Sequence, residues 1–442
     1  MPSHRRVTQL HERIEIMERS QAGQSDKEIA AAMGWSWETV RKWRRKGQRE
    51  GRHGLAPKLG RPATGALSSF GSSIQTEIET LRRTHPGWGP ETLRLELRKD
   101  PQFATTTLPS RSRIAAFLKD RDFVRPYARH TELAQPPATA PTVPHEEWEL
   151  DAQGVQTVTG IGAVAVINLA DGYSRLRVES WGCQGRSKAS TEDYQLACRR
   201  GFMRYGLPRR ISLDHDTVFF DSNNASPFPS RFHLWLLSLG VEVRFISQPP
   251  PNEHAVVERT HHLLSQQALV GQSFTTASQM QTRLDERCAF LNSEYPSRTW
   301  HGHPPLAVHP LAHHSCRSYT PETEAAQMDL QRVYHYLAQH RWFRHVSAQG
   351  QFTLGGYRYG LGSTWVRQTI EIHFDPQTVE LMCISADGQR SQRKAAQGLS
   401  KADLMGELPP WDNLPAYQRH LPFSFPALRE DALFQEMAGT IL

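Results

Sequence analysis

The chain has 442 residues, 52 Lys and Arg against 45 Asp and Glu, and a formal net charge of +7. A 38% hydrophobic fraction is typical of a globular protein, and the absence of any apolar run of about 18 residues argues against a membrane helix. The five cysteines are scattered and never form Cys-x-x-Cys, which argues against a disulfide framework and a zinc ribbon. The excess of positive charge suggests a polyanionic partner. The first residues lack the apolar core of a signal peptide, so we expect a cytoplasmic protein.

Residues 1–50 have the pattern of a helix-turn-helix domain. Ser25 and Glu28 form a capping box at one helix start, and Gly34 marks the turn that follows. The next helix turns Val40 inward and is basic on its outer side, as expected of a helix that enters a major groove. An ordinary three-helix bundle is the alternative. The side chains that we expect to contact DNA are Arg41, Lys42, Arg44, Arg45 and Lys46.

Three segments follow before the centre of the chain. Residues 51–70 are a basic linker interrupted by Gly and Pro. Residues 71–130 hold three further helical patterns, which predict a second helix-turn-helix or winged-helix domain with Arg111 and Arg113 toward DNA. Residues 131–145 are rich in Pro, Ala and Thr and predict an extended linker.

Residues 146–310 alternate between the patterns of strands and helices. Three predicted strands come first, and helices then alternate with two more strands. Three antiparallel strands followed by this alternation is the ribonuclease H-like order. The predicted strands span 148–155, 162–170, 175–181, 210–214 and 241–245, and the predicted helices span 187–205, 231–240 and about 253–270.

The C-terminal part is different in character. Within residues 330–400, period-2 runs separated by Gly and Asp-Pro turns predict a small β-barrel. Residues 401–442 form a mixed tail, which fits either a partner-recruiting segment or a solvated extension. The predicted fold class is therefore multidomain α/β, with N-terminal helix-turn-helix units, a ribonuclease H-like catalytic core and a C-terminal small β-barrel.

Three acidic residues of the core stand out by their positions. Asp151 and Asp214 end apolar runs that we predict as strands, and Glu258 lies in a predicted helix. Two strand-borne carboxylates and one helix-borne carboxylate can converge on a pair of Mg²⁺ or Mn²⁺ ions. The three positions alone are weak evidence, because surface and capping roles are commoner. We prefer Asp214 to Asp216 because Asp214 ends the apolar run, and we expect Asp171 to serve a turn.

The local sequence around these acids strengthens the assignment. The informative stretches are Trp148 to Asp151, Asn168 to Arg175, Gly206 to Phe219, Glu258 to His261, and Asn292 to Pro296 with Gly302 to Pro305. Together they resemble the transposases of bacterial insertion sequences and the integrase catalytic core that these share with retroviruses. The resemblance covers most of the chain and is strongest from about 146 to 306.

The resemblance implies a DDE-type transposase of the bacterial cytoplasm, associated with the nucleoid. It implies that Asp151, Asp214 and Glu258 bind two Mg²⁺ or Mn²⁺ ions about 3.5–4 Å apart. The implied activity cuts the element ends and joins each 3′-OH to target DNA. The implied partners are double-stranded DNA, further copies of the chain and, as in some related systems, an ATPase.

The sequence also departs from the family's usual motifs beside the second and third acids. His215 and Asp216 replace the usual Asn-Gly after the second acid, and His254 and Ala255 replace the Asn-Gly before the third. The stretch near 221–230 looks inserted. These changes favour a rival reading, in which the chain is a catalytically silent, domesticated transposase that acts as a sequence-specific DNA-binding regulator.

Other functions have weaker support. A ribonuclease H-type nuclease would act on RNA–DNA hybrids, whereas paired helix-turn-helix units suit duplex DNA. The histidine-rich stretch 301–316 lacks the ligand spacing of a zinc site. The sequence contains no Gly-x-x-x-x-Gly-Lys phosphate loop, so it shows no ATPase site of its own.

Overall fold

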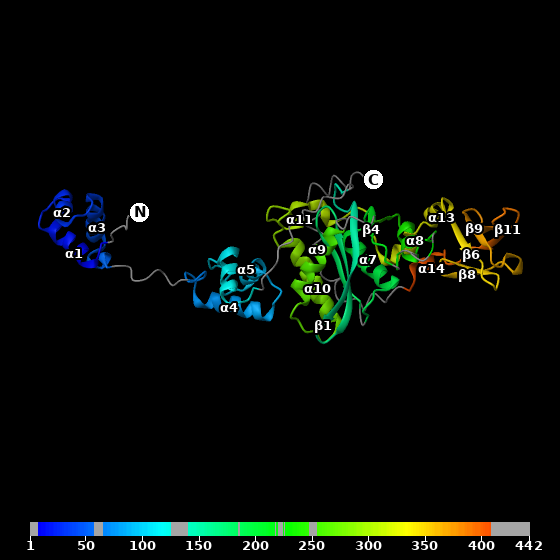
Figure 1. Ribbon diagram of the computed structural model, residues 1–442, viewed down its shortest axis with the longest axis horizontal. Helices are drawn as coiled ribbons and strands as arrows, with labels where there is room; N and C mark the ends of the chain where they lie inside the picture. Colours follow the sequence, from blue (N-terminus) through cyan, green and yellow to red (C-terminus); the bar gives the residue numbers. More distant parts are fainter. Residues whose placement is uncertain are drawn as a thin grey trace. The chain divides into compact units, whose positions relative to one another are not determined.

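The structure is a computed structural model that describes residues 8–56, 65–124, 140–183, 186–216, 218–219, 224, 226–246 and 254–407 (Figure 1). It divides into two compact units. The first holds residues up to 76 together with 107–124, and the second holds residues 77–106 and those from 125 onward. Within the described ranges, no helix is both long enough and apolar enough to span a bilayer.

The first unit contains the predicted helix-turn-helix elements. Ser25 and Glu28 form the expected capping box, and Gly34 ends its helix in the left-handed conformation, with φ of 67°. Ile29 and Val40 are fully buried in a small core shared by the three helices. The helices of this region are α1 (Leu10–Gln21), α2 (Asp26–Met33), α3 (Trp37–Glu50), α4 (Ser72–Thr84), which crosses the unit boundary, and α6 (Arg111–Asp120).

The second unit is built on a mixed five-stranded sheet of order β3-β2-β1-β4-β5. β1, β2 and β3 pair antiparallel, and β4 and β5 continue the sheet parallel to β1. The mixed α/β core predicted from the sequence is therefore confirmed. Its elements are β1 (Glu147–Val158), β2 (Gly162–Asp171), β3 (Arg177–Gly182), α7 (Thr191–Tyr205), β4 (Arg210–Leu213), α8 (Arg231–Ser238), β5 (Glu242–Phe245), α9 (Ala255–Leu264) and α10 (Ala277–Ser293).

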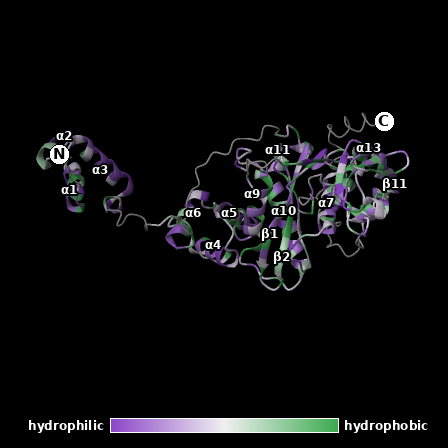
Figure 2. Ribbon diagram, turned by 45° about the vertical axis from the view of Figure 1, so that its right-hand side comes forward, coloured by the Kyte–Doolittle hydropathy of each residue, from purple (hydrophilic) through white to green (hydrophobic). Residues whose placement is uncertain are grey.

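Helices cover both faces of this sheet, with α9 and α10 on one side and α7 on the other (Figure 1). Alternate residues of a strand face opposite sides. Trp148 and Leu150 therefore join the main core, which includes residues of α7 and α8, whereas Ala170 packs with Val256 and Val257 of α9. β2 is coloured as hydrophobic along much of its length in Figure 2, as expected of a central strand covered on both faces.

A tight turn before α5 (Pro90–Lys99) is fixed inside the second unit. The Trp88 indole Nε1 donates to the Gln267 carbonyl at 3.1 Å, and the Gln267 amide donates to Thr92 Oγ1 at 2.9 Å. A Cβ on Gly87 would lie 2.0 Å from the Gln266 carbonyl oxygen, so this close approach requires glycine. Residues of the predicted 71–130 domain are thus divided between the two units.

The C-terminal part starts with a helix and continues as β-structure. An open antiparallel sheet of order β11-β10-β9-β6 and a separate β7-β8 hairpin follow α13. Closure of these strands into the predicted barrel is not shown. The tail beyond residue 407 lies outside the described residues. The elements are α13 (Leu330–Ala338), β6 (Arg341–His345), β7 (Gln351–Leu354), β8 (Tyr357–Gly360), β9 (Thr369–Asp375), β10 (Glu380–Ile384), β11 (Ser391–Ala395) and α14 (Lys401–Met405).

Candidate functional site

The strand register places two of the predicted acids on the sheet face that α9 covers. Asp151 of β1 is 28% exposed and lies directly opposite Asn168 of β2. Glu149, two residues earlier on the same strand face, pairs in register with Ser212 of β4. The same alternation directs Asp214, the first residue after β4, toward this face.

Asp214 is oriented by its own turn. Its carboxylate oxygen Oδ1 accepts the backbone N–H of Asp216 at 3.1 Å, and Asp216 Oδ1 accepts that of Val218 at 3.2 Å. Asp214 therefore stands where the strand ends, and Asp216 forms the next step of the loop. Residues 221–223 and 225 of the stretch that looked inserted lie outside the described residues.

The third acid approaches from α9. Glu258 is solvent-exposed on the first turns of this helix. The helix is attached to β1 through Glu149, whose Oε2 accepts the backbone N–H groups of Val256 at 3.0 Å and Val257 at 2.9 Å. These are amides that a helix N-terminus leaves without intrahelical partners. Because β1 carries both Glu149 and Asp151, the attachment brings Glu258 to the Asp151 side of the sheet.

The three carboxylates affect one another electrostatically through Asp151. Burial raises the pKa of Asp214, and the negative charges of Asp151 and Asp216 raise it further. Although Glu258 is largely exposed, partial desolvation of its carboxylate also raises its pKa, again with a contribution from Asp151. Carboxylates that disfavour one another's ionised form are a common feature of sites that use a cation.

The residues present fit a divalent cation in their chemistry. Three carboxylates provide the hard oxygen ligands that Mg²⁺ and Mn²⁺ prefer. Among the described residues, however, no group of three or more His, Cys, Asp or Glu side chains is placed to hold a metal ion. Asp151, Asp214 and Glu258 are therefore electrostatic neighbours that do not form a closed ligand set.

Two residues beside Asp151 were not predicted as site residues. His261, one turn after Glu258, places its Nε2 3.1 Å from Asp151 Oδ2, and Asn168 meets the other ring nitrogen at 2.6 Å. Both residues lie in the sequence stretches that resemble integrase cores, Asn168 to Arg175 and Glu258 to His261. Their roles could not be predicted, because they depend on a contact between segments about 90 residues apart. Burial raises the pKa of the Tyr194 phenol, and the charges of Asp216, Asp151 and Asp214 raise it further.

The basic residues of α3 differ in their availability to a ligand. Arg41, Lys42 and Arg45 are exposed, and α3 is coloured as hydrophilic in Figure 2. The Arg44 guanidinium instead points back to α2, where its Nε and Nη2 donate to the two carboxylate oxygens of Asp26 at 2.6 and 3.0 Å. Arg44 therefore ties two helices of the domain together.

The remaining predicted DNA contacts are also on the surface. Lys46 is half-buried, with its ammonium 5.2 Å from the centre of the Trp43 ring. Arg111 and Arg113 are exposed on α6, and Arg113 donates to Ser69 Oγ at 2.9 Å. Their contact with DNA stays a prediction.

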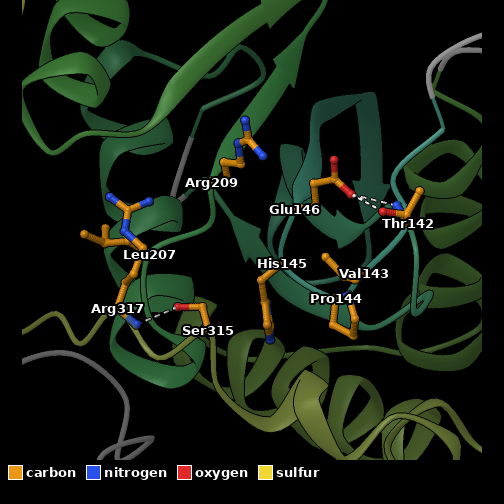
Figure 3. A pocket seen from close by; sticks show the side chains of 9 residues that line it. All are labelled: Thr142, Val143, Pro144, His145, Glu146, Leu207, Arg209, Ser315 and Arg317. Atoms are coloured by element: carbon orange, nitrogen blue, oxygen red, sulfur yellow. Dashed lines mark hydrogen bonds between the residues drawn. The ribbon is translucent and has the colours of Figure 1, made fainter. Parts of the chain in front are cut away.

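A cavity of about 310 Å³ opens beside the start of β1 (Figure 3), and none of the three predicted acids lines it. Its Arg317 guanidinium is occupied by the backbone carbonyls of Pro208, Leu239 and Gly240. Burial lowers the pKa of His145 on its wall to about 4, so this ring is neutral at pH 7. The cavity holds no grouping of acids or nucleophiles, and we assign it no role in the chemistry.

Comparisons with known proteins identify one part of the chain. A family model described as a helix-turn-helix domain matches residues 12–63. No curated protein matches the chain. A cryo-EM structure of the simian T-cell lymphotropic virus intasome with a PP2A regulatory subunit is 11% identical, covers 73% of this chain and 96% of that chain, and has a TM-score of 0.32. The magnesium-bound HTLV-2 integrase catalytic core is 12% identical, covers 37% and 94%, and has a TM-score of 0.27. Because both TM-scores are low, we draw no conclusion from these two structures.

Proposed function

We propose that the chain is a DNA transposase of the DDE type. The observation that carries this proposal is the arrangement of Asp151 and Asp214 on one face of a mixed sheet, with Glu258 on the helix α9 that Glu149 and Asp151 hold against this face. A DNA-binding domain at the other end of the sequence supports it. The ribonuclease H-like core would act on phosphodiesters, and the N-terminal domains would select where it acts.

The residues have distinct parts in this proposal. Asp151, Asp214 and Glu258 would hold two Mg²⁺ or Mn²⁺ ions, which neutralise charge at the scissile phosphate and activate the attacking oxygen. Asp151 is rigid on its strand, whereas the longer Glu258 side chain reaches in from a helix. Binding two ions would require the three carboxylates to move into one ligand set around Asp151.

DNA recognition would begin at α3. Arg41, Lys42 and Arg45 would contact phosphates or base edges of the element's terminal repeats, with Lys46, Arg111 and Arg113 supporting them. Two ends must be held at once, so we propose that the chain acts as a homo-oligomer on DNA in the bacterial cytoplasm. An ATPase partner recruited by the tail stays a prediction, and most of the tail lies outside the described residues.

A strand-transfer assay tests the proposal. The substrate is the duplex that the full chain selects from a random library, supplied with Mg²⁺ or Mn²⁺ and a target plasmid. We expect Asp151→Asn to abolish cleavage and joining while DNA binding persists, and Asp216→Asn to retain joining. Unchanged joining by Asp151→Asn refutes the assignment of the site.

The second candidate is a catalytically silent, domesticated transposase that regulates transcription or DNA architecture by sequence-specific binding. It is favoured by the lack of a closed metal-ligand set among the described residues. The same assay separates the two functions. Specific binding by the unaltered chain with no product in either metal supports the regulator and refutes the enzyme.

A further inference from the structure

His261 links the two central strands to the helix that carries Glu258. Its Nε2 lies 3.1 Å from Asp151 Oδ2, and its Nδ1 lies 2.6 Å from the Asn168 amide nitrogen. Asp151 and Asn168 are register partners on β1 and β2, so both side chains stand side by side on one sheet face. A single imidazole therefore bridges a cross-strand pair.

The proton positions on this imidazole follow from its two neighbours. The Asn168 amide donates to Nδ1, which leaves the ring hydrogen on Nε2, and Nε2 then donates to the Asp151 carboxylate. Asn168 is fully buried, and its Oδ1 has no hydrogen-bond partner among the described residues. Rotating that amide by 180° would let Oδ1 accept from Nδ1–H. In that second arrangement Nε2 donates to Asp151 only when both ring nitrogens carry hydrogen.

The bridge also fixes the position of α9 on the sheet. Glu149 holds the first turn of α9 through two backbone amides, and His261 holds the next turn through Asp151. Glu258 lies between these two attachments and three residues before His261, so Glu258 and His261 occupy the same side of the helix. Movement of α9 along β1 would break one attachment or the other.

We propose that His261, held by Asn168, is a positioning residue for the carboxylate site. It fixes Asp151 through Oδ2, which leaves Oδ1 for a divalent cation, and it holds the turn of α9 that follows Glu258. This inference rests on the proposed function, since it assigns a partner to a proposed metal ligand. Removing a residue that hydrogen-bonds to a metal ligand and orients it typically weakens metal binding by about 10- to 100-fold.

The first measurement is Mn²⁺ binding to the full chain by isothermal titration calorimetry, which needs no catalysis. We expect His261→Ala to weaken Mn²⁺ binding by about 10- to 100-fold and Asn168→Ala to weaken it less. His261→Gln can restore a side-chain N–H near the Nε2 position, so its affinity should be closer to that of the unaltered chain. His262→Ala is the matched control, because His262 is the exposed neighbour on the same helix, and we expect no change.

The second measurement is strand transfer as a function of Mg²⁺ concentration. His261→Ala should shift the half-maximal Mg²⁺ concentration upward by a similar factor, with activity recovering at high metal, whereas Asp151→Asn stays inactive. The double variant of His261 and Asn168 should be no worse than His261→Ala, because both act through one bridge. A merely structural histidine would lower thermal stability without moving the metal dependence.

The outcomes separate the two proposals. Unchanged Mn²⁺ affinity in His261→Ala overturns the positioning role, as does failure of the unaltered chain to bind Mn²⁺. If His261→Ala does not fold, Asn168→Ala decides the question, and unchanged affinity there also overturns it. If Mn²⁺ binds and weakens as expected but no strand transfer occurs, the transposase proposal fails and the positioning role stands.

Discussion

Glu149 offers a quantitative test of how α9 is held on the sheet. Burial raises the pKa of this carboxyl from 4.5 to about 7, although the Val257 and Val256 amides oppose the shift. Because the folded-state pKa is above the unfolded one, protonated Glu149 stabilises the fold below about pH 4.5, and this stability is lost as pH rises through 7. At ~1.4 kcal/mol per pKa unit, the difference amounts to about 3 kcal/mol.

The substitution Glu149→Gln should remove this dependence. Glutamine keeps an acceptor oxygen for the two α9 amides but carries no titrating proton. The free energy of unfolding can be measured by urea titration with tryptophan fluorescence from pH 4.5 to 8. As pH rises, we expect the free energy of unfolding of the variant to increase relative to that of the wild type by up to about 3 kcal/mol. Asp171, whose pKa burial raises to about 6, titrates in both proteins and cancels from the difference.

The control titrates below this range. The Thr142 backbone N–H lowers the pKa of Glu146 from its usual 4.5, so its stabilising contribution is present above about pH 4.5 and is lost as pH falls further. Glu146→Gln should therefore differ from the wild type by a nearly constant amount from about pH 5 to 8. A Glu149→Gln variant that parallels the wild type at every pH would refute the reasoning. The helix amides would then outweigh burial and keep Glu149 ionised throughout.

Two further predictions concern basic side chains. We expect Arg41→Ala to make the slope of log K for DNA binding against log salt concentration shallower by about 0.9, because an exposed cation that contacts a phosphate releases one counterion. Fluorescence anisotropy at several salt concentrations measures this slope. Arg44→Ala should instead leave that slope unchanged and lower the free energy of unfolding by up to about 1 kcal/mol, because Arg44 pairs with Asp26 within the domain. Equal slopes for the two variants would contradict this prediction. Glu324→Gln should cost about 3–5 kcal/mol in thermal unfolding by leaving buried Arg199 uncompensated, whereas the exposed control Glu286→Gln should cost under about 1 kcal/mol.

Local patterns were sufficient to predict much of the fold. The capping box of Ser25 and Glu28 and the turn at Gly34 depend on neighbouring residues, and both were confirmed. The strands of the core were confirmed because long apolar runs between turns have few alternatives. No local pattern indicates the π-helix at Ser265–Leu269, because such an irregularity is set by what packs against the helix. Here Trp88 and Thr92 bind Gln267 within it.

The acids of the candidate site could be predicted from the sequence, but the residues that hold them in position could not. Asp214 could be placed at a strand end because the length of an apolar run is a local property. Asp151 was expected to end its run as well, but β1 continues past it to Val158, because pairing with β2 extends the strand through polar residues. The partners of these acids depend on register and helix position, which no local pattern determines. Asn168 reads as one polar residue in an apolar strand, and only the antiparallel register makes it the neighbour of Asp151. Likewise Arg44 reads as one of several basic residues until Asp26 is seen to engage it.

The unusual residues before Glu258 can be understood in the same physical terms. His254 stands at the N-cap of α9 and makes no side-chain cap hydrogen bond, and its φ of −114° is not helical. A helix start normally needs a nearby acceptor for its free amides. Glu149 provides that acceptor from β1, more than 100 residues earlier in the chain. The cap is therefore supplied by the same strand that carries Asp151, so a change of the local sequence at 254–255 leaves the position of Glu258 tied to the first acid of the site.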